Sequence, residues 1–355
     1  MSLPKNNLFV MWQYAALLFY FYKHNTVNNN RELLDKLLII SPFNFILYFK
    51  QKGLSMSVEA FTLSQMHIEA ARNSTDDFNL FHDKFRWNTI KSNPFGSPIA
   101  LGFQLECFLE HQINQYRENS NEITYIKQHD LNFSSYEISF IGVVKSGDTL
   151  STVIKKSKIE DTTDNHILSN RIVLKSNNKL VMMGYKRDSQ NPVICQFDNL
   201  PDLTGINEHP DRCMYKNTEF FIKRKFMIVG NAKNFLTSSF AEQSNYIDEF
   251  IDKVTFPEIF PISLLSSALL ERAQYTDYDL LNNPLVYTSH KLSIDKRLLL
   301  QLKSNDKIHI LVDKAKADDE THKLVHQCFG IIEGGQVLFT AEIELIPLSY
   351  LLSAS

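Results

Sequence analysis

The chain repeats itself at low identity. Residues 95–110 (FGSPIALGFQLECFLE) align without a gap with residues 256–271 (FPEIFPISLLSSALLE), and residues 145–150 (KSGDTL) align with residues 303–308 (KSNDKI). The two offsets, 161 and 158 residues, nearly agree, so two matches occur in the same order. Repetition at a fixed period is the sequence signature of a duplicated structural unit. We therefore expect two copies of one domain, which suits a length of 355 residues.

Within each copy the pattern predicts a helix followed by strands. Residues 103–116 have apolar side chains at helical spacing, at Leu105, Phe108, Leu109 and Ile113. Strands are expected at residues 123–129, 137–145, 149–156, 167–175 and 180–185, separated by turn residues at 146–148 and 177–178. In the second copy, residues 325–332 and 337–346 flank a Gly-Gly turn in the same way. One helix followed by an antiparallel meander is typical of the α+β class.

These patterns divide the chain into four parts. We expect an N-terminal helical extension over residues 1–50, a first domain over 51–187, a Pro- and Asp-rich linker over 188–214 and a second domain over 215–355. Residues 8–22 form an almost continuous apolar run, which at 15 residues is short for a bilayer span of about 20 residues. We expect a helix docked on the protein, with membrane contact through residues 8–22 as the alternative.

Composition excludes several classes of function. A net charge of −3 with interspersed signs gives no electrostatic footprint for nucleic acid. The chain has no Gly-rich phosphate-binding loop. Its four cysteines are far apart, and its histidines lack zinc-ligand spacing apart from His322 and His326, which are expected on a strand or turn. No metal is therefore expected, and a reducing, cytoplasmic location is predicted.

Residues 77–82 (DFNLFH) carry the most specific chemical signal. Their D-x-N-x-x-H spacing is followed by F-G-x-P-I-A-x-G at residues 95–102 and by G-D-T-L at residues 147–150. These three pieces, spread over roughly residues 55–190, resemble the MaoC-like family of R-specific enoyl thioester hydratases and dehydratases. The resemblance implies a hotdog fold, in which a curved antiparallel sheet wraps one long helix. The whole chain would be a double hotdog, either a pseudo-dimeric monomer or a homodimer.

The resemblance also implies roles for individual residues. Asp77 and His82 correspond to the catalytic acid/base pair, and Gly102 to the glycine whose N–H meets the thioester carbonyl. Asn79, Phe95, Pro98 and Ile99 are expected to bind substrate. A carboxylate and an imidazole that share one water can hydrate a 2-enoyl thioester to the (R)-3-hydroxyacyl form and reverse the reaction. No cofactor is expected, since coenzyme A or the phosphopantetheine of an acyl carrier protein carries the substrate.

The sequence departs from the family pattern in places. Leu80 stands where the family usually has Pro, and Leu101 where a His often precedes the glycine. In the second copy, residues 240–250 contain Asn245 and Asp248 but no following His, and Ser263 replaces the glycine. We therefore expect one active site per chain and a degenerate second domain that supports the first and shapes an acyl tunnel.

Two alternatives to a hydratase stay open. The same scaffold hosts thioesterases, which also use a carboxylate and water, and a non-catalytic acyl-binding or scaffold protein would keep the motif by descent. The basic segments 186–187 and 223–225 would either contact the phosphates of the carrier or lie at solvated strand ends.

Overall fold

The computed structural model describes residues 61–162, 165–318 and 320–353. The chain divides into two compact units at residues 59 and 60, and the described residues belong to the second unit. The predicted N-terminal extension (1–50), with its apolar run at 8–22, lies outside them. No helix within the described ranges is long and apolar enough to cross a bilayer.

The first half of the described chain contains the longest helix and a set of strands. Strand β1 (Phe61–Thr62), helix α4 (Gln65–Thr75), turns η1 (Leu80–His82) and η2 (Trp87–Thr89), and helices α5 (Gly102–Asn119) and α6 (Glu122–Gln128) come first. They are followed by β2 (Phe133–Phe140), β3 (Thr149–Ile154), β4 (Lys158–Asp161), β5 (His166–Ser176) and β6 (Lys179–Ser189). Ser64 caps α4, since its side-chain oxygen accepts the N–H of His67.

The second half contains a matching series of elements. Strands β7 (Cys213–Met214) and β8 (Phe221–Phe226), helix α7 (Val229–Ser238), η3 (Gln243–Asn245), β9 (Ile247–Asp248), η4 (Glu249–Ile251) and β10 (Lys253–Val254) precede helices α8 (Ile259–Ser263) and α9 (Leu265–Tyr275). Then come β11 (Leu285–Asp295), α10 (Lys296–Leu299), β12 (Lys307–Val312), β13 (Lys316–Asp318), β14 (Lys323–Ile332), η5 (Glu333–Gly335), β15 (Gln336–Pro347) and α11 (Leu348–Ser353). Strand β12 begins 158 residues after β3, the offset expected from the sequence.

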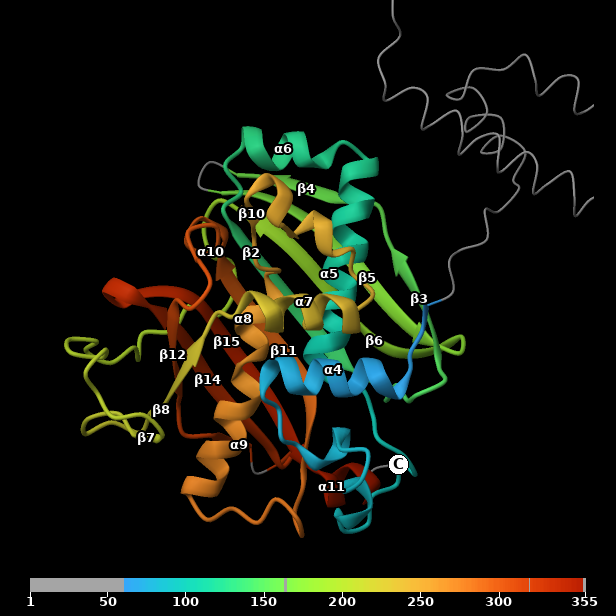
Figure 1. Cartoon of the computed structure of the whole chain (residues 1–355), viewed down its shortest axis with the longest axis vertical. Coiled ribbons are helices and arrows are strands. Elements are labelled where there is room, and N and C mark those ends of the chain that lie inside the picture. The colour runs from blue at the N-terminus through green and yellow to red at the C-terminus, as the bar shows by residue number, and fades with distance from the viewer. Residues whose placement is uncertain (1–60, 163–164, 319, 354–355) are drawn as a thin grey trace, which may run out of the picture. The chain divides into compact units, whose positions relative to one another are not determined.

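Apart from β9 and β10, which pair only with each other, the strands described in both halves join in one curved antiparallel sheet (Figure 1). Its order is β1-β3-β5-β6-β2-β11-β15-β14-β12-β8-β7, so the order in one half is repeated in reverse in the other. The halves meet where β2 pairs with β11, from Ser139 opposite Ser289 to Phe133 opposite Asp295. Helices α5, α8 and α9 lie along one face of this sheet (Figure 1). The α+β prediction is confirmed.

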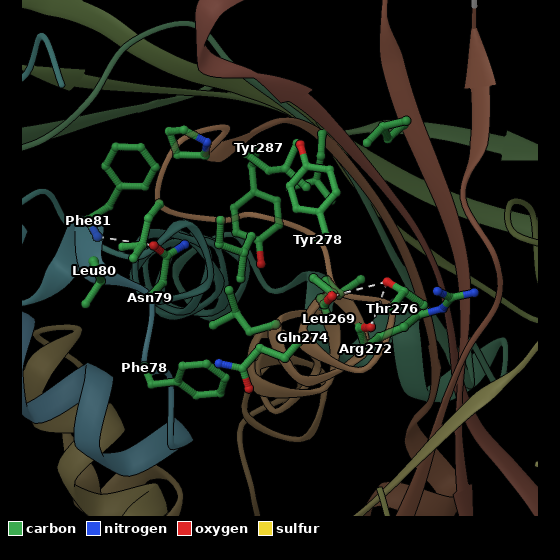
Figure 2. Close-up of a pocket in the computed structure, with 18 of the residues that line it drawn as sticks. Phe78, Asn79, Leu80, Phe81, Leu269, Arg272, Gln274, Thr276, Tyr278 and Tyr287 are labelled. Atoms are coloured by element: carbon green, nitrogen blue, oxygen red, sulfur yellow. Dashed lines mark hydrogen bonds between the residues drawn. The ribbon is translucent and has the colours of Figure 1, made fainter. Parts of the chain in front are cut away.

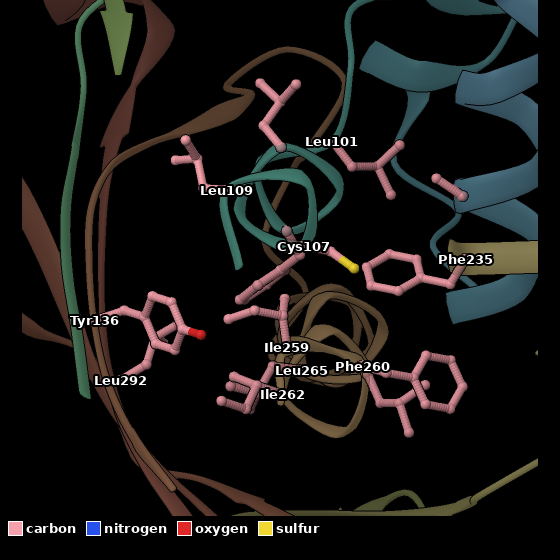
Figure 3. Packing of buried hydrophobic residues seen from close by; sticks show 14 of the residues in the cluster. Leu101, Cys107, Leu109, Tyr136, Phe235, Ile259, Phe260, Ile262, Leu265 and Leu292 are labelled. Atoms are coloured by element: carbon pink, nitrogen blue, oxygen red, sulfur yellow. The ribbon is translucent and has the colours of Figure 1, made fainter. Parts of the chain in front are cut away.

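The core is continuous across the two halves. Figure 3 shows Cys107 and Leu109 on α5 close to Ile259 and Ile262 on α8, with Leu292 of β11 on the sheet side. All five side chains belong to one buried cluster. Burial of apolar side chains contributed by both halves therefore stabilises the halves together.

One predicted strand is wrong. Residues 123–129 lie mostly in helix α6. Ile123 and Ile126 are three residues apart, so they share one face of a helix, and both line a small polar cavity beside α5. The pattern of such a short segment is compatible with both a strand and a helix, and here packing favours the helix.

Helix α5 buries polar residues in addition to the predicted apolar stripe. Its buried polar side chains are Gln104, Glu106, Glu110, His111 and Arg117. The helix packs on the sheet and also contacts α7 and α8, so little of it faces solvent. Each of these polar groups consequently needs a partner inside the protein.

A buried cluster of charges joins the halves near the C-terminal end of α5. Asp188 of β6 forms ion pairs with Arg117, Lys186 and Lys296, and Lys186 Nζ also lies 3.1 Å from a carboxylate oxygen of Glu258. Burial alone would raise the pKa of Asp188, but the three neighbouring cations lower it well below its usual value. Asp188 is therefore an anion that the second half, through Lys296, helps to neutralise.

Both interpretations of the basic segments are wrong for their lysines. Lys186, Lys223 and Lys225 are buried. Lys223 Nζ lies 2.8 Å from Glu271, and Lys225 Nζ lies 2.9 Å from Asp76. Alternate residues of a strand share a face, so Lys223 and Lys225 of β8 point inward together. Each lysine is neutralised by a carboxylate of the protein itself.

Replacement of Asp188 by Asn tests the charge cluster. It leaves the buried Arg117 and Lys186 and the partly buried Lys296 short of one negative charge, so we expect the free energy of unfolding to fall by about 3–5 kcal/mol. Urea unfolding measures this loss. The control, Glu160→Gln, breaks the exposed pair with Lys158 and is expected to change the midpoint little. Equal midpoints for both variants would show that the cluster does not stabilise the fold.

Candidate active site

Asp77 and His82 flank a short turn that is stabilised by hydrogen bonds among residues 77–81. The chain leaves α4 through Asp76 in the left-handed conformation. The Asn79 N–H then donates to Asp77 Oδ1 at 2.8 Å, and Asn79 Oδ1 accepts the N–H of Phe81 at 3.1 Å. Such side-chain-to-backbone bonds are the ordinary way in which Asp and Asn fix a turn. They orient the Asp77 carboxylate through one oxygen and leave Oδ2 for other partners.

His82 is oriented by a backbone carbonyl. Its Nδ1 lies 2.8 Å from the carbonyl oxygen of Ile99, which can only accept, so Nδ1 carries a proton. In the neutral form of this tautomer the lone pair is at Nε2. Nε2 lies 3.9 Å from Asp77 Oδ2, and the two side chains are 5% and 2% exposed. This distance is too long for a direct hydrogen bond, but both atoms can bind one water molecule or substrate hydroxyl.

Gly102 begins α5 close to the same turn. Ile99, whose carbonyl holds His82, also donates its N–H to the carbonyl of Phe81 at 3.0 Å. Three residues later the helix starts, without a side-chain cap from its N-cap residue Leu101. The first N–H groups of a helix have no intrahelical acceptor. An N–H donor at the positive end of the helix dipole thus lies near the Asp77–His82 pair.

Gly102 is packed too closely for a larger residue. A Cβ atom here would lie 3.0 Å from two ring carbons of Phe140 and 3.6 Å from Cε1 of His290. The absence of a side chain therefore lets the start of α5 rest directly on β2 and β11.

A buried His–Glu pair lies beneath this helix end. His290 Nδ1 is 3.0 Å from Glu106 Oε1, and neither side chain is exposed. The His290 ring stacks on Phe103 with centroids 4.5 Å apart. Within the described part of the chain, Glu106 Oε2 and His290 Nε2 have no hydrogen-bond partner. The second half thus contributes a titratable group next to Gly102.

A cavity of about 570 Å³ opens beside the motif, between residues of the two halves (Figure 2). Residues Phe78, Asn79, Leu80 and Phe81 line it from the first half, and Leu269, Arg272, Tyr278, Tyr287, His326 and Leu345 are among those that line it from the second. Burial lowers the pKa of His326 to about 4, so this ring is neutral. Most of the wall is apolar, as expected of a site for a hydrocarbon chain.

Of the predicted site residues, Asn79 lines this cavity. Asp77, His82 and Gly102 are not among its lining residues, but Asp77 and His82 directly precede and follow the four wall residues 78–81 in the sequence. Phe95, Pro98 and Ile99, which were expected to bind substrate, are absent from its wall. Ile99 packs in a small apolar cluster that includes Phe95, and the Phe95 ring lies 5.6 Å from that of Phe81. Ile99 and Phe95 therefore pack against residues of the 77–82 motif and do not line the cavity.

The sequence analysis missed the contributions of the second half. Tyr287 lies on the cavity wall and His290 lies next to Gly102, and no local motif marks either residue. Their position depends on the pairing of β2 with β11. Within the described residues, no group of three or more His, Cys, Asp or Glu side chains is placed to hold a metal ion.

The corresponding helix end in the second half is closed. Glu110 of α5 accepts the N–H of Glu258 at 2.9 Å and that of Ile259 at 3.1 Å. Burial and the nearby Glu258 carboxylate raise the pKa of Glu110 to about 8. Ser263, the counterpart of Gly102, lies inside α8 rather than at the start of the helix. Asp248 accepts the N–H of Phe250 at 3.0 Å and so caps the η4 turn.

Comparison with solved structures identifies the architecture. A MaoC-like dehydratase superposes with a TM-score of 0.53 at 9% identity, covering 81% of this chain and 96% of its own. A MaoC domain dehydratase from Chloroflexus aurantiacus gives 0.52 at 11% identity, covering 82% and 93%. A conserved hypothetical protein from Mycobacterium tuberculosis, described as a double hotdog, gives 0.51 at 12% identity, covering 82% and 94%.

These likenesses show the fold, and the predicted double hotdog is confirmed. No model of a known protein family matches the chain, and no curated protein does.

The tight packing at Gly102 can be tested by Gly102→Ala. The added methyl would press on the Phe140 ring, so we expect a loss of about 1–3 kcal/mol in the free energy of unfolding. Phe140→Leu in the same chain should recover part of this loss by making room.

Gly230→Ala is the matched control, measured by urea unfolding alongside Gly102→Ala. Gly230 lies in α7 with open space around its Cβ position, so alanine there should be neutral or slightly stabilising. If Gly102→Ala and Gly230→Ala change the free energy of unfolding equally, the Phe140 ring does not restrict the side chain at position 102.

Proposed function

We propose that this double hotdog protein catalyses the reversible hydration of 2-enoyl thioesters to (R)-3-hydroxyacyl thioesters, in one site per chain. The observation that carries the proposal is the buried pair formed by Asp77 Oδ2 and His82 Nε2, 3.9 Å apart. With Asp77 ionised and the His82 ring in its neutral form, both atoms are hydrogen-bond acceptors. A single water molecule can donate one hydrogen to each and keep its own lone pair free for attack.

This arrangement supplies both proton transfers of the reaction. The water oxygen attacks C3 of the enoyl group while the Asp77–His82 pair takes a proton from the water. The pair then returns a proton to C2, so that OH is added at C3, H is added at C2 and the site ends unchanged. Dehydration is the same path in reverse.

Gly102 fits the remaining requirement of the chemistry. Attack at C3 moves negative charge onto the thioester oxygen, and a fixed N–H donor at that oxygen lowers the barrier. The unpaired N–H groups at the start of α5 are such donors, and the helix dipole adds to their effect.

The cavity between the halves suits the acyl chain, and we propose coenzyme A or a carrier-protein phosphopantetheine as its carrier. Residues of the second half make up much of the cavity wall. The α8 end is closed by Glu110, and no histidine follows Asp248 in the motif region. We infer that the second half shapes the substrate site of the first and has no site of its own.

A thioesterase is the second candidate. The shared fold does not discriminate between a hydratase and a thioesterase. In a thioesterase, a water molecule activated by a carboxylate would attack the thioester carbonyl. The pairing of that carboxylate with a histidine lone pair favours hydration, because protonation of C2 needs a second group that can hold the proton.

The proposal is tested by steady-state turnover of short- and medium-chain enoyl-CoA, followed by the loss of enoyl thioester absorbance. Asp77→Asn and His82→Ala should each lower kcat/KM by about 10²–10⁴-fold, since each removes one member of the acid/base pair. The matched control is Asp248→Asn in the second half, which should keep wild-type activity.

A thiol-release assay on the same substrates separates the two candidates. Free CoA without loss of the enoyl group would replace hydration by hydrolysis. If CoA-linked and carrier-linked substrates are neither hydrated nor hydrolysed, both enzymatic proposals are wrong and a non-catalytic acyl-binding role takes their place.

A further inference from the structure

Tyr287 is a polar side chain that the second half inserts into the cavity wall. It belongs to β11 and lines the cavity together with Asn79 of the motif. In Figure 2 its hydroxyl is directed toward the middle of the cavity. The Asp77 carboxylate is close enough to act on it electrostatically.

A β-bulge brings Tyr287 to this position. Opposite β15, Tyr287 pairs with Leu345 and Ser289 with Glu344, which leaves Thr288 as an extra residue in β11. In a regular strand, residues three apart face opposite sides of the sheet. Tyr287 and His290 are three apart, yet their ring centroids lie 4.5 Å from each other. The bulge turns Tyr287 onto the helix-covered face, as bulges next to active sites do.

His290 links this tyrosine to Gly102. The His290 ring packs against Tyr287 on one side, and its Cε1 lies 3.6 Å from the Cβ position of Gly102. Phe103, the next residue of α5, has its ring centroid 6.1 Å from that of Tyr287. The Tyr287 ring therefore lies beside the start of α5, next to residues that contact Gly102.

The hydroxyl of Tyr287 is held ready to donate. Its oxygen lies 3.1 Å from Ser266 Oγ of α9. When Ser266 donates in this pair, the proton of Tyr287 is free for another acceptor. Burial and the negative charge of Asp77 raise the pKa of Tyr287 far above its usual value, so the group stays protonated.

We propose that the Tyr287 hydroxyl is a second hydrogen-bond donor to the thioester oxygen, acting with the Gly102 N–H while the charge of the enolate develops. The assignment rests on the proposed hydratase function. Tyr287 keeps its proton throughout and takes part in no covalent step. The second half would then contribute a catalytic residue to the site of the first.

Tyr287→Phe in the full chain tests the assignment, because it removes the hydroxyl and keeps the ring. Loss of one such donor lowers kcat by about 10²-fold, with a much smaller change in KM. The matched control is Tyr246→Phe, which removes a buried, hydrogen-bonded hydroxyl outside this cavity and should keep wild-type kcat. A Tyr287→Phe enzyme with kcat within twofold of wild type would overturn the assignment.

A binding measurement makes the test independent of rate. Titration calorimetry compares a saturated acyl-CoA thioester with its thioether analogue, which lacks the carbonyl oxygen. Tyr287→Phe should weaken binding of the thioester and leave the thioether unchanged. Equal weakening of both would assign Tyr287 a structural role and overturn the proposal.

Ser266→Ala covers the case in which Tyr287→Phe does not fold. This variant keeps the tyrosine but removes its orienting partner, so we expect a smaller loss of kcat and the same selective loss of thioester affinity. If neither quantity changes, Tyr287 does not act through its oriented hydroxyl.

The proposed function and this assignment fail in different ways. A wild-type protein that hydrates no enoyl thioester overturns the proposed function, and the role of Tyr287 with it. An active wild type with an equally active Tyr287→Phe variant overturns the assignment alone.

Discussion

The antiparallel pairing of β2 with β11 is the interaction on which the rest of the structure depends. It joins two sheets into one and places α5 beside α8 over a common core. It also brings Tyr287 and His290, residues of the second half, to the start of α5. Without this pairing each half would expose an unpaired strand edge. The candidate site, although its motif is local in sequence, is thus completed by a long-range contact.

The two halves differ most at the ends of their helices. In the first half, α5 begins at Gly102 without a side-chain cap. In the second half, the helical segment begins earlier, at Ile259, and a carboxylate from α5 satisfies its first N–H groups. Glu110 performs this capping from within the first half. The same helix therefore offers a donor at one end and, further along, blocks the equivalent donors of its neighbour.

Sequence reasoning succeeded where the determining interactions are local. The helix expected from residue 103 and the strand expected from residue 149 depend on neighbouring residues, and the structure has both, as α5 and β3. It failed where distant residues decide. Lys225 is buried because Asp76, far away in sequence, pairs with it, and the α6 helix forms from a segment whose periodicity fits both structures. The position of Tyr287 on the cavity wall could not be predicted for the same reason, since a bulge opposite β15 sets the direction of its side chain.

The junction between the halves also has a consequence for biosynthesis. The partner of β2, strand β11, ends at Asp295, roughly 150 residues after β2. At about 5–20 residues per second, a ribosome needs on the order of ten to thirty seconds to make that stretch. Throughout that interval, β2 is an open edge in the nascent first half, and the charge cluster around Asp188 lacks Lys296. The nascent first half therefore exposes a strand edge of the kind that promotes aggregation until the second half has been made.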